Sequence, residues 1–128
     1  MEKEFVLLVA DSNPYIRSFL KRELTESGYK VKIAGSVKEI FASLKPENPP
    51  DLLILELDMP LKIGLEVLDR LHNLVPMPQV IVYTHLVEYQ YIEQLQWIDA
   101  FVEKNGSPLP LKKVIAEVLQ NRHFRCFK

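Results

Sequence analysis

The fold is decided by the stretch Pro50–Pro60, which reads PDLLILELDMP. Its centre, Leu52 to Leu57, is an apolar run of strand length interrupted only by Glu56, and proline stands at both ends of the stretch. An apolar run without alternation is typical of a strand that is buried on both faces, as in a parallel sheet. The stretch therefore predicts an interior strand that delivers the carboxylates of Glu56 and Asp58 at its carboxyl end.

Short apolar runs alternate with segments of helical periodicity along the rest of the chain. The expected strands are Phe5–Ala10, Tyr29–Ala34, Leu52–Leu57, Val80–Tyr83 and Ala100–Val102. The expected helices are Pro14–Leu24, Val37–Leu44, Leu65–Val75, Val87–Leu95 and Leu111–Leu119. Because Tyr29–Ala34 alternates apolar and polar residues, it is expected at an edge. Strands alternating with helices imply a parallel sheet with right-handed crossovers and helices on both faces, a three-layer α/β fold.

The composition fits a globular protein with one core. The 128 residues are 48% hydrophobic and 26% charged, and the net charge of −1 gives no electrostatic reason to expect binding to nucleic acid or to an anionic membrane. Cys126 is the single cysteine, which excludes an internal disulfide and a cysteine-rich metal site. No apolar run approaches the ~20 residues that span a bilayer. Without a signal-like start either, we expect a cytoplasmic protein.

We expect a single domain over residues 1–122 and a C-terminal tail over residues 123–128. The tail is basic and aromatic. It is interpreted as a frayed extension of the last helix, with a docking tail as the alternative.

Polar side chains follow four of the predicted strands. Asp11-Ser12-Asn13 follows the first, Glu56 and Asp58 the third, Thr84-His85 the fourth, and Lys104-Asn105 the fifth. In an open parallel sheet, ligands bind outside the carboxyl ends of the strands. An acidic cluster, a hydroxyl and a lysine that converge from separate strands therefore predict a functional site at this edge.

Nearly the whole chain, roughly Phe5 to Leu119, resembles the receiver domain of response regulators, the phosphate-accepting module of two-component signalling. The resemblance implies a flavodoxin-like sheet of order 2-1-3-4-5. It also implies that Asp11 is an acid of the metal pocket and that Glu56 stands at the phosphoacceptor position. By the same resemblance, Thr84 is the switch hydroxyl, Phe101 the switch aromatic and Lys104 the lysine of the pocket. Met59-Pro60 and Gly64 match the loop that follows the third strand.

Three departures from the family pattern affect the chemistry. Ser12 stands where the family has a second acid that contacts Mg²⁺, and a hydroxyl is a far poorer ligand for this ion. Glu56 replaces the phosphoacceptor aspartate, and its longer side chain displaces the attacking oxygen, which can cost ~100-fold in rate. Asn105 replaces a proline that usually takes a cis bond. We therefore expect a pseudo-receiver without a required cofactor, in which Mg²⁺ binding at Asp11 and Glu56 is weakened.

The expected function is that of a stand-alone signalling domain that acts through protein–protein contacts and is not an enzyme. Glu56 either pairs with Lys104 and mimics the phosphorylated state, or lies in an inert pocket. The alternatives are a phosphoacceptor in a phosphorelay and, from another class, a small phosphohydrolase or phosphotransferase. A flavin site is not expected, because the loop after the first strand lacks glycine and carries the wrong charge.

Each site residue also has a purely structural interpretation. Asp11 could cap the first helix, Glu56 could be a solvated strand-end charge, and Thr84 could be an ordinary strand residue. Lys104 could form a surface pair with Glu103. We do not expect metal binding by the histidines, which are His72, His85 and His123.

The resemblance also indicates where partners bind. In the family, the face made by the fourth helix, the last strand and the last helix is the common docking and dimerisation surface. Tyr89 and Trp97 are expected to be exposed there, whereas Tyr91 is assigned to the core. The expected partners are a histidine kinase or an output protein, and the same face would serve a homodimer.

Overall fold

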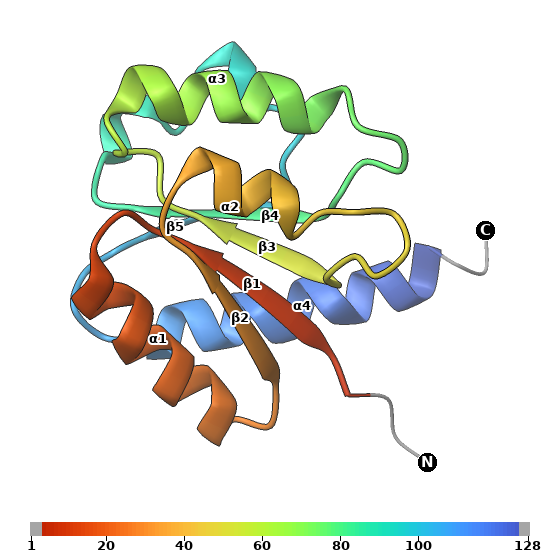
Figure 1. Ribbon diagram of the computed structural model, residues 1–128. Coiled ribbons are helices and arrows are strands. Elements are labelled where there is room, and N and C mark those ends of the chain that lie inside the picture. Colours follow the sequence, from red (N-terminus) through yellow and green to blue (C-terminus); the bar gives the residue numbers. More distant parts are fainter. Residues whose placement is uncertain (1–3, 126–128) are drawn as a thin grey trace.

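The computed structural model describes the backbone of residues 4–125 and the side chains of residues 4–121. Its sheet has five parallel strands in the order β2-β1-β3-β4-β5 (Figure 1). The strands are β1 (Val6–Ala10), β2 (Lys30–Ala34), β3 (Leu52–Leu55), β4 (Val80–Thr84) and β5 (Ala100–Glu103). The parallel α/β fold, the strand order and the edge position of β2 are therefore confirmed.

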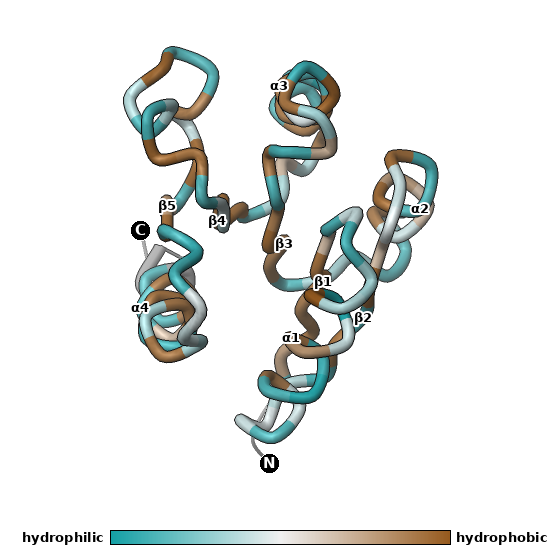
Figure 2. The backbone as a smooth tube through the Cα atoms, turned by 90° about the vertical axis from the view of Figure 1, so that its left-hand side faces the viewer, coloured by the Kyte–Doolittle hydropathy of each residue, from teal (hydrophilic) through white to brown (hydrophobic). Residues whose placement is uncertain are grey.

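Helices cover both faces of the sheet. They are α1 (Pro14–Glu26), α2 (Val37–Ala42), α3 (Leu61–His72) and α4 (Leu109–Arg125). Figure 2 shows α1 and α4 on one side of the sheet and α2 and α3 on the other. Successive residues of a strand point to opposite faces. Leu7 and Val9 accordingly join one core cluster, while Leu8 and Ala10 join the other.

The start of α1 follows directly from the sequence after β1. The side chain of Asn13 accepts hydrogen bonds from the backbone N–H groups of Tyr15, at 2.9 Å, and Ile16, at 3.3 Å. Pro14 occupies the first helical position, where a missing N–H costs nothing. Since Asn13 supplies the cap, Asp11 is left for the candidate site.

Gly64 allows α3 to pack closely against the end of β3. A Cβ atom at this position would lie 2.0 Å from the carbonyl oxygen of Leu57, which no side chain could tolerate. The glycine therefore brings the first turns of α3 against the segment that carries Glu56.

Two aspartates close the amino ends of strands by the same pair of bonds. The N–H of Asp51 donates to the carbonyl of Val6 at 2.7 Å, and the N–H of Val6 donates to the Asp51 carboxylate at 2.8 Å. In the same way, Asp99 donates to Val80 at 2.9 Å, and Val80 donates back to the Asp99 carboxylate at 2.8 Å. Each aspartate directly precedes its own strand and is bonded to the first residue of the neighbouring strand.

The prediction of a helix over Val87–Leu95 is wrong. The segment forms two short 3₁₀ helices instead, η1 (Val87–Tyr89) and η2 (Glu93–Leu95), and neither has a side-chain cap. The assignment of Tyr91 to the core is also wrong, because its side chain is 85% exposed. The residues of this segment that are buried therefore differ from those that an α-helix would bury.

The last helix is longer than the pattern predicts, since α4 continues through Arg125. Residues 123–125 of the predicted tail are therefore helical, and residues 126–128 lie outside the described part. No helix within residues 4–125 is both long enough and apolar enough to cross a membrane.

Candidate functional site

The sheet brings four polar side chains together at the carboxyl ends of its strands. Asp11 follows β1 directly, Glu56 follows β3, Thr84 ends β4, and Lys104 follows β5. Asp11 and Glu56 are each 5% exposed, and Thr84 is fully buried. Charged groups are rarely buried to this degree unless they are paired.

Lys104 is the cation that pairs with both buried carboxylates. Its Nζ lies 2.7 Å from Glu56 Oε1 and 2.8 Å from Asp11 Oδ2, and its side chain is 16% exposed. The predicted contact between Glu56 and Lys104 is therefore present. The alternative of a surface pair between Lys104 and Glu103 fails, because Lys104 points into the pocket.

Further hydrogen bonds fix the Glu56 carboxylate. Glu56 Oε2 accepts from the backbone N–H of Asp58 at 3.0 Å, and the Thr84 hydroxyl lies near enough to the carboxylate to help lower its pKa. Thr84 Oγ1 in turn accepts from the N–H of Leu86 at 3.2 Å. Glu56 is thus held by the N–H of its own loop and by Lys104, the residue that follows β5.

These contacts shift the pKa values of the pair in opposite directions. Burial raises the pKa of Glu56, but hydrogen bonds from the Asp58 N–H, Lys104 and Thr84, with the charge of Lys104, outweigh burial and hold the pKa below its ordinary value. Burial lowers the pKa of Lys104, but hydrogen bonds and charge from Asp11 and Glu56 outweigh it and raise that pKa. Both groups are therefore charged at neutral pH.

The pH dependence of stability is expected to reflect both shifts. The lowered pKa of Glu56 stabilises the folded state above about pH 4.5, and this contribution is lost as the pH falls through the folded-state pKa. The raised pKa of Lys104 stabilises the folded state below about pH 10.5, and this contribution is lost as the pH rises through the folded-state pKa. Urea unfolding at a series of pH values measures the free energy of unfolding, which should fall at low pH (the acid limb) and at high pH (the alkaline limb). Glu56→Gln should flatten the acid limb; an acid limb as steep as that of the unaltered protein would contradict the assignment.

The donor set does not fit a magnesium ion. All four carboxylate oxygens of Asp11 and Glu56 already accept hydrogen bonds, the fourth being Asp11 Oδ1, which accepts from the N–H of Asn13 at 2.8 Å. The Lys104 ammonium lies between the two carboxylates, where a divalent cation would be repelled. Ser12 is exposed and offers only a hydroxyl. Within residues 4–121, no group of three His, Cys, Asp or Glu side chains is arranged to hold a metal.

Two polar side chains lie at the mouth of the pocket. Asp58 is 46% exposed and His85 is 59% exposed. The ring nitrogens of His85 lie 3.9 Å from Glu56 Oε1 and 3.9 Å from Asp58 Oδ2. His85 therefore stands near both acids without a close contact to either.

The aromatic residues predicted for switching and partner binding, Phe101, Tyr89 and Trp97, are half-buried. Phe101 packs at the edge of the core cluster that α2 and α3 cover. Trp97 packs against the same cluster and stacks on the ring of His72, with 4.9 Å between centroids and 3° between planes. The expected exposure of Tyr89 and Trp97 is wrong, because both side chains are half-buried; the exposed ring of this region is Tyr91.

Arg17 is a contributor to the site that the sequence reasoning missed. Its Nη1 donates to the carbonyl oxygen of Asp11 at 2.7 Å, and its guanidinium covers Gly35. The spacing from Asp11 to Arg17 places the arginine in the first turns of α1, but nothing in the pattern indicates that its side chain turns back toward the loop.

Known proteins are similar to this chain in sequence and in fold. The family model for the response regulator receiver domain matches residues 7–116. A transcriptional activator of Pseudomonas putida, ExaE, is 30% identical over 119 residues, which cover 88% of this chain and 54% of the activator. The chain therefore spans about half the length of this curated relative.

Two solved structures are similar over almost their full length. The response regulator TrrA of Thermotoga maritima, in complex with Mg²⁺ and BeF, is 29% identical with a TM-score of 0.80, covering 89% of this chain and 98% of that one. A structure of TrrA in complex with the histidine kinase ThkA gives 30% identity and a TM-score of 0.80, covering 90% of this chain and 98% of that one. With the family match and the shared strand order, this chain belongs to the response regulator receiver domain family.

Proposed function

We propose that this receiver domain signals through protein–protein contacts without being phosphorylated, and that Glu56 replaces the phosphoryl group. The observation that carries the proposal is the 2.7 Å contact between Glu56 and Lys104. In a phosphorylated receiver, the lysine and the switch hydroxyl would contact the phosphoryl group. In this chain, Lys104 bonds to Glu56 instead, and the Thr84 hydroxyl lies near enough to that carboxylate to help lower its pKa.

The electrostatics of the pocket support this proposal over phosphoryl transfer. A phosphoryl donor is an anion that would approach Asp11, Glu56 and Asp58, and catalysis of its transfer needs cations to offset the charge. Lys104 already bonds to two carboxylates, and Ser12 withholds the additional ligand that would recruit Mg²⁺. Glu56 is itself held by its bonds to Lys104 and the Asp58 N–H, which oppose in-line attack.

The partner we propose is a histidine kinase or an output protein. The kinase complex of the similar protein TrrA supports a kinase as one candidate. A kinase that still docks on this chain, without transferring a phosphoryl group, would be held in a complex by the domain.

The unaltered protein is expected not to accumulate a phosphoryl group. Incubation with acetyl phosphate and Mg²⁺, followed by intact-mass spectrometry, should show no species heavier by one phosphoryl group. A typical aspartate-bearing receiver serves as the positive control. Stoichiometric labelling of the chain at Glu56 would overturn the proposal and favour a phosphorelay role.

A further inference from the structure

We propose that the free edge of β2 binds an extended segment of a partner protein in which acidic and apolar residues alternate. β2 is the outer strand of the sheet and has β1 as its neighbour (Figure 1). Its residues pair with β1 in an uninterrupted register, without a bulge or a proline. A regular edge of this kind is a template to which another strand can add. Because β1 separates β2 from β3, a segment bound there would leave Glu56 untouched.

Two residues of β2 direct their backbone groups away from the sheet. The N–H of Lys30 donates to the carbonyl of Phe5 at 2.9 Å, and the carbonyl of Ala34 accepts from the N–H that follows β1 at 3.1 Å. Backbone groups of successive residues point to opposite sides of a strand, so those of Val31 and Ile33 point away from β1. In the described part of the chain, no hydrogen bond to these outward groups is found. Both residues therefore offer a donor and an acceptor to an added strand.

The free stretch of the edge is short, because both of its ends are closed by bonds within the chain. The N–H of Tyr29 donates to the carbonyl of Leu24 at 3.2 Å. The N–H of Gly35 donates to Glu39 Oε1 at 2.7 Å. An added strand would therefore lie alongside residues 31–33.

The two faces of β2 carry different side chains. Val31 and Ile33 lie on the face that α1 and α4 cover, where Val31 packs against the core and Ile33 is 41% exposed. Lys30 and Lys32 lie on the opposite face, exposed and half-buried respectively. Side chains that lie opposite each other on neighbouring strands interact. An added strand is therefore favoured when it is apolar on the α1 face and acidic on the other.

The lysines of this edge are available to an acidic partner. Residues 29–38 contain Lys30, Lys32 and Lys38 but no acidic residue. None of the three lysines forms an ion pair with another residue of the described chain. Glu39, the next acid along the chain, already accepts a backbone N–H. The positive charge along the edge therefore favours an acidic segment.

The same lysines disfavour a second copy of this chain as the occupant. Antiparallel pairing of β2 with the β2 of another copy would bring the lysines of both copies together on one face. Like charges opposite each other on neighbouring strands are destabilising, and lysine on an edge strand commonly prevents such pairing. The charge that blocks self-association is thus the charge that selects an acidic strand.

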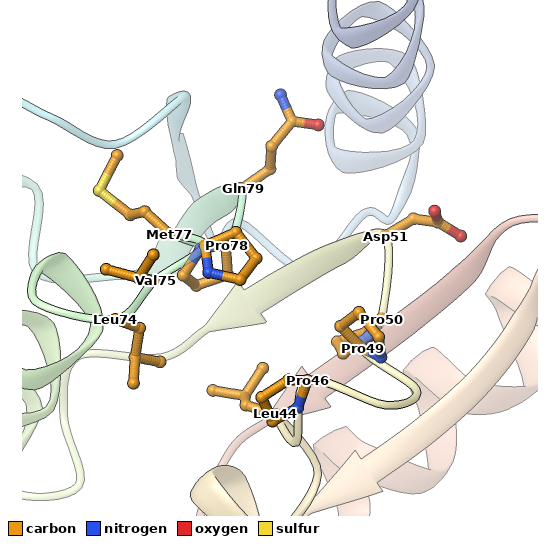
Figure 3. A pocket seen from close by; sticks show the side chains of 11 residues that line it. Leu44, Pro46, Pro49, Pro50, Asp51, Leu74, Val75, Met77, Pro78 and Gln79 are labelled. Carbon is orange, nitrogen blue, oxygen red and sulfur yellow. The ribbon is translucent and has the colours of Figure 1, made fainter.

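The apolar pocket shown in Figure 3 lacks a selective charge of this kind. It lies between residues 44–51 and residues 74–79, has a volume of about 200 Å³, and is lined mainly by leucine and proline. Its charged lining residue, Asp51, is bonded to the N–H of Val6 at 2.8 Å. The edge of β2 is therefore the surface whose chemistry specifies an occupant.

The edge is tested by amide NMR and hydrogen exchange on the full chain, with acetyl-Glu-Val-Glu-Val-Glu-amide as the probe. In the free protein, the N–H groups of Val31 and Ile33 should exchange faster than that of Lys32, which faces β1. The peptide should cause saturable shifts in β2. Near saturation it should slow the exchange of Val31 and Ile33 about 10-fold, because both N–H groups become hydrogen-bonded.

Two further peptides separate strand addition from simple charge attraction. In one, lysine replaces each glutamate, and in the other the same residues are rearranged as Glu-Glu-Val-Val-Glu, which breaks the alternation. Both should bind at least about 5-fold more weakly than the probe. Equal binding of either peptide overturns the proposal, as does a lack of protection of Val31 and Ile33 by the probe.

Charge reversal on β2 supplies the matched variant. Lys30→Glu with Lys32→Glu should reverse the preference between the glutamate and lysine peptides. Lys62→Glu with Lys113→Glu changes the net charge equally, at exposed lysines of α3 and α4, and should keep the preference of the unaltered chain. Thermal unfolding checks that both variants fold. An unchanged preference in the β2 variant would refute the role of its lysines.

A second copy is distinguished by sedimentation of the chain without peptide. The proposal predicts that β2 does not mediate a dimer. A concentration-dependent dimer in which Val31 and Ile33 become protected from exchange would assign the edge to another copy and refute the acidic partner segment.

Discussion

The double substitution Ser12→Asp with Glu56→Asp is expected to turn this chain into a protein that accepts a phosphoryl group. Shortening the side chain at position 56 withdraws the carboxylate from Lys104 and opens space for the incoming group. The new acid at position 12 adds a ligand for Mg²⁺, which offsets the repulsion between anions. We expect labelling by acetyl phosphate to rise at least ~100-fold over the unaltered chain.

The single substitutions are the controls for this result. Glu56→Asp alone should restore little, because Ser12 still withholds a metal ligand, and Ser12→Asp alone should restore less, because Glu56 still occupies the pocket. Intact-mass spectrometry with and without Mg²⁺ measures all four proteins. Equal labelling of Glu56→Asp and the double variant would show that the second acid is not limiting.

Lys104→Ala is expected to destabilise the fold by about 3 kcal/mol, because it leaves two buried carboxylates without their cation. For a chain of this size, the loss corresponds to a fall in Tm of about 10 °C. Urea and thermal unfolding measure it. The substitution should also weaken the binding of a partner that depends on the state of the pocket.

The matched control is Lys112→Ala. Lys112 forms a pair with Glu23 at 3.0 Å, but both side chains are more exposed than those of the buried pair, so its loss should cost under about 1 kcal/mol. Combining Lys104→Ala with Glu56→Gln removes one of the orphaned charges, so the double variant should be more stable than the sum of the two single losses predicts. Additive losses would show that the pair has no energetic coupling.

The fold could be predicted from the sequence because its interior strands carry strong local signals. The apolar runs at Leu52–Leu55 and Val80–Thr84 are buried throughout, as their lack of alternation indicates. The polar residues that follow the strands converge because parallel strands end at one edge. The contact between Glu56 and Lys104 could be expected from that convergence, since lysine is the cation delivered there.

The region between β4 and β5 could not be predicted in the same way. Val87, Tyr91 and Leu95 have the spacing of an α-helical face, and this led to the helix that the structure lacks. Leu86, Ile92, Leu95, Trp97 and Ile98 pack inward instead. Of these, Ile92, Leu95 and Ile98 are three residues apart, which is the period of a 3₁₀ helix. Over so short a segment both periods fit the sequence, and packing against the core decides between them.

The contact of Lys104 with Asp11 was also beyond prediction. Both residues were assigned to the pocket, but their separation depends on how far β1 and β5 diverge across the twisted sheet, with β3 and β4 between them. The lysine reaches both acids at once because its side chain is long enough to span that gap.

The aspartates that directly precede β3 and β5 determine where Glu56 and Lys104 lie along the strands, and therefore whether the two groups meet. A strand that is apolar on both faces, such as β3, could slide past its neighbours without exposing any polar residue, so alternation cannot fix its register. Asp51 fixes it for β3 by its bonds to Val6, and Asp99 fixes it for β5 by its bonds to Val80. Glu56 comes five positions after Asp51, and Lys104 comes five positions after Asp99. A slip of one residue would move either group by about 3.3 Å, more than the whole length of the bond that joins them.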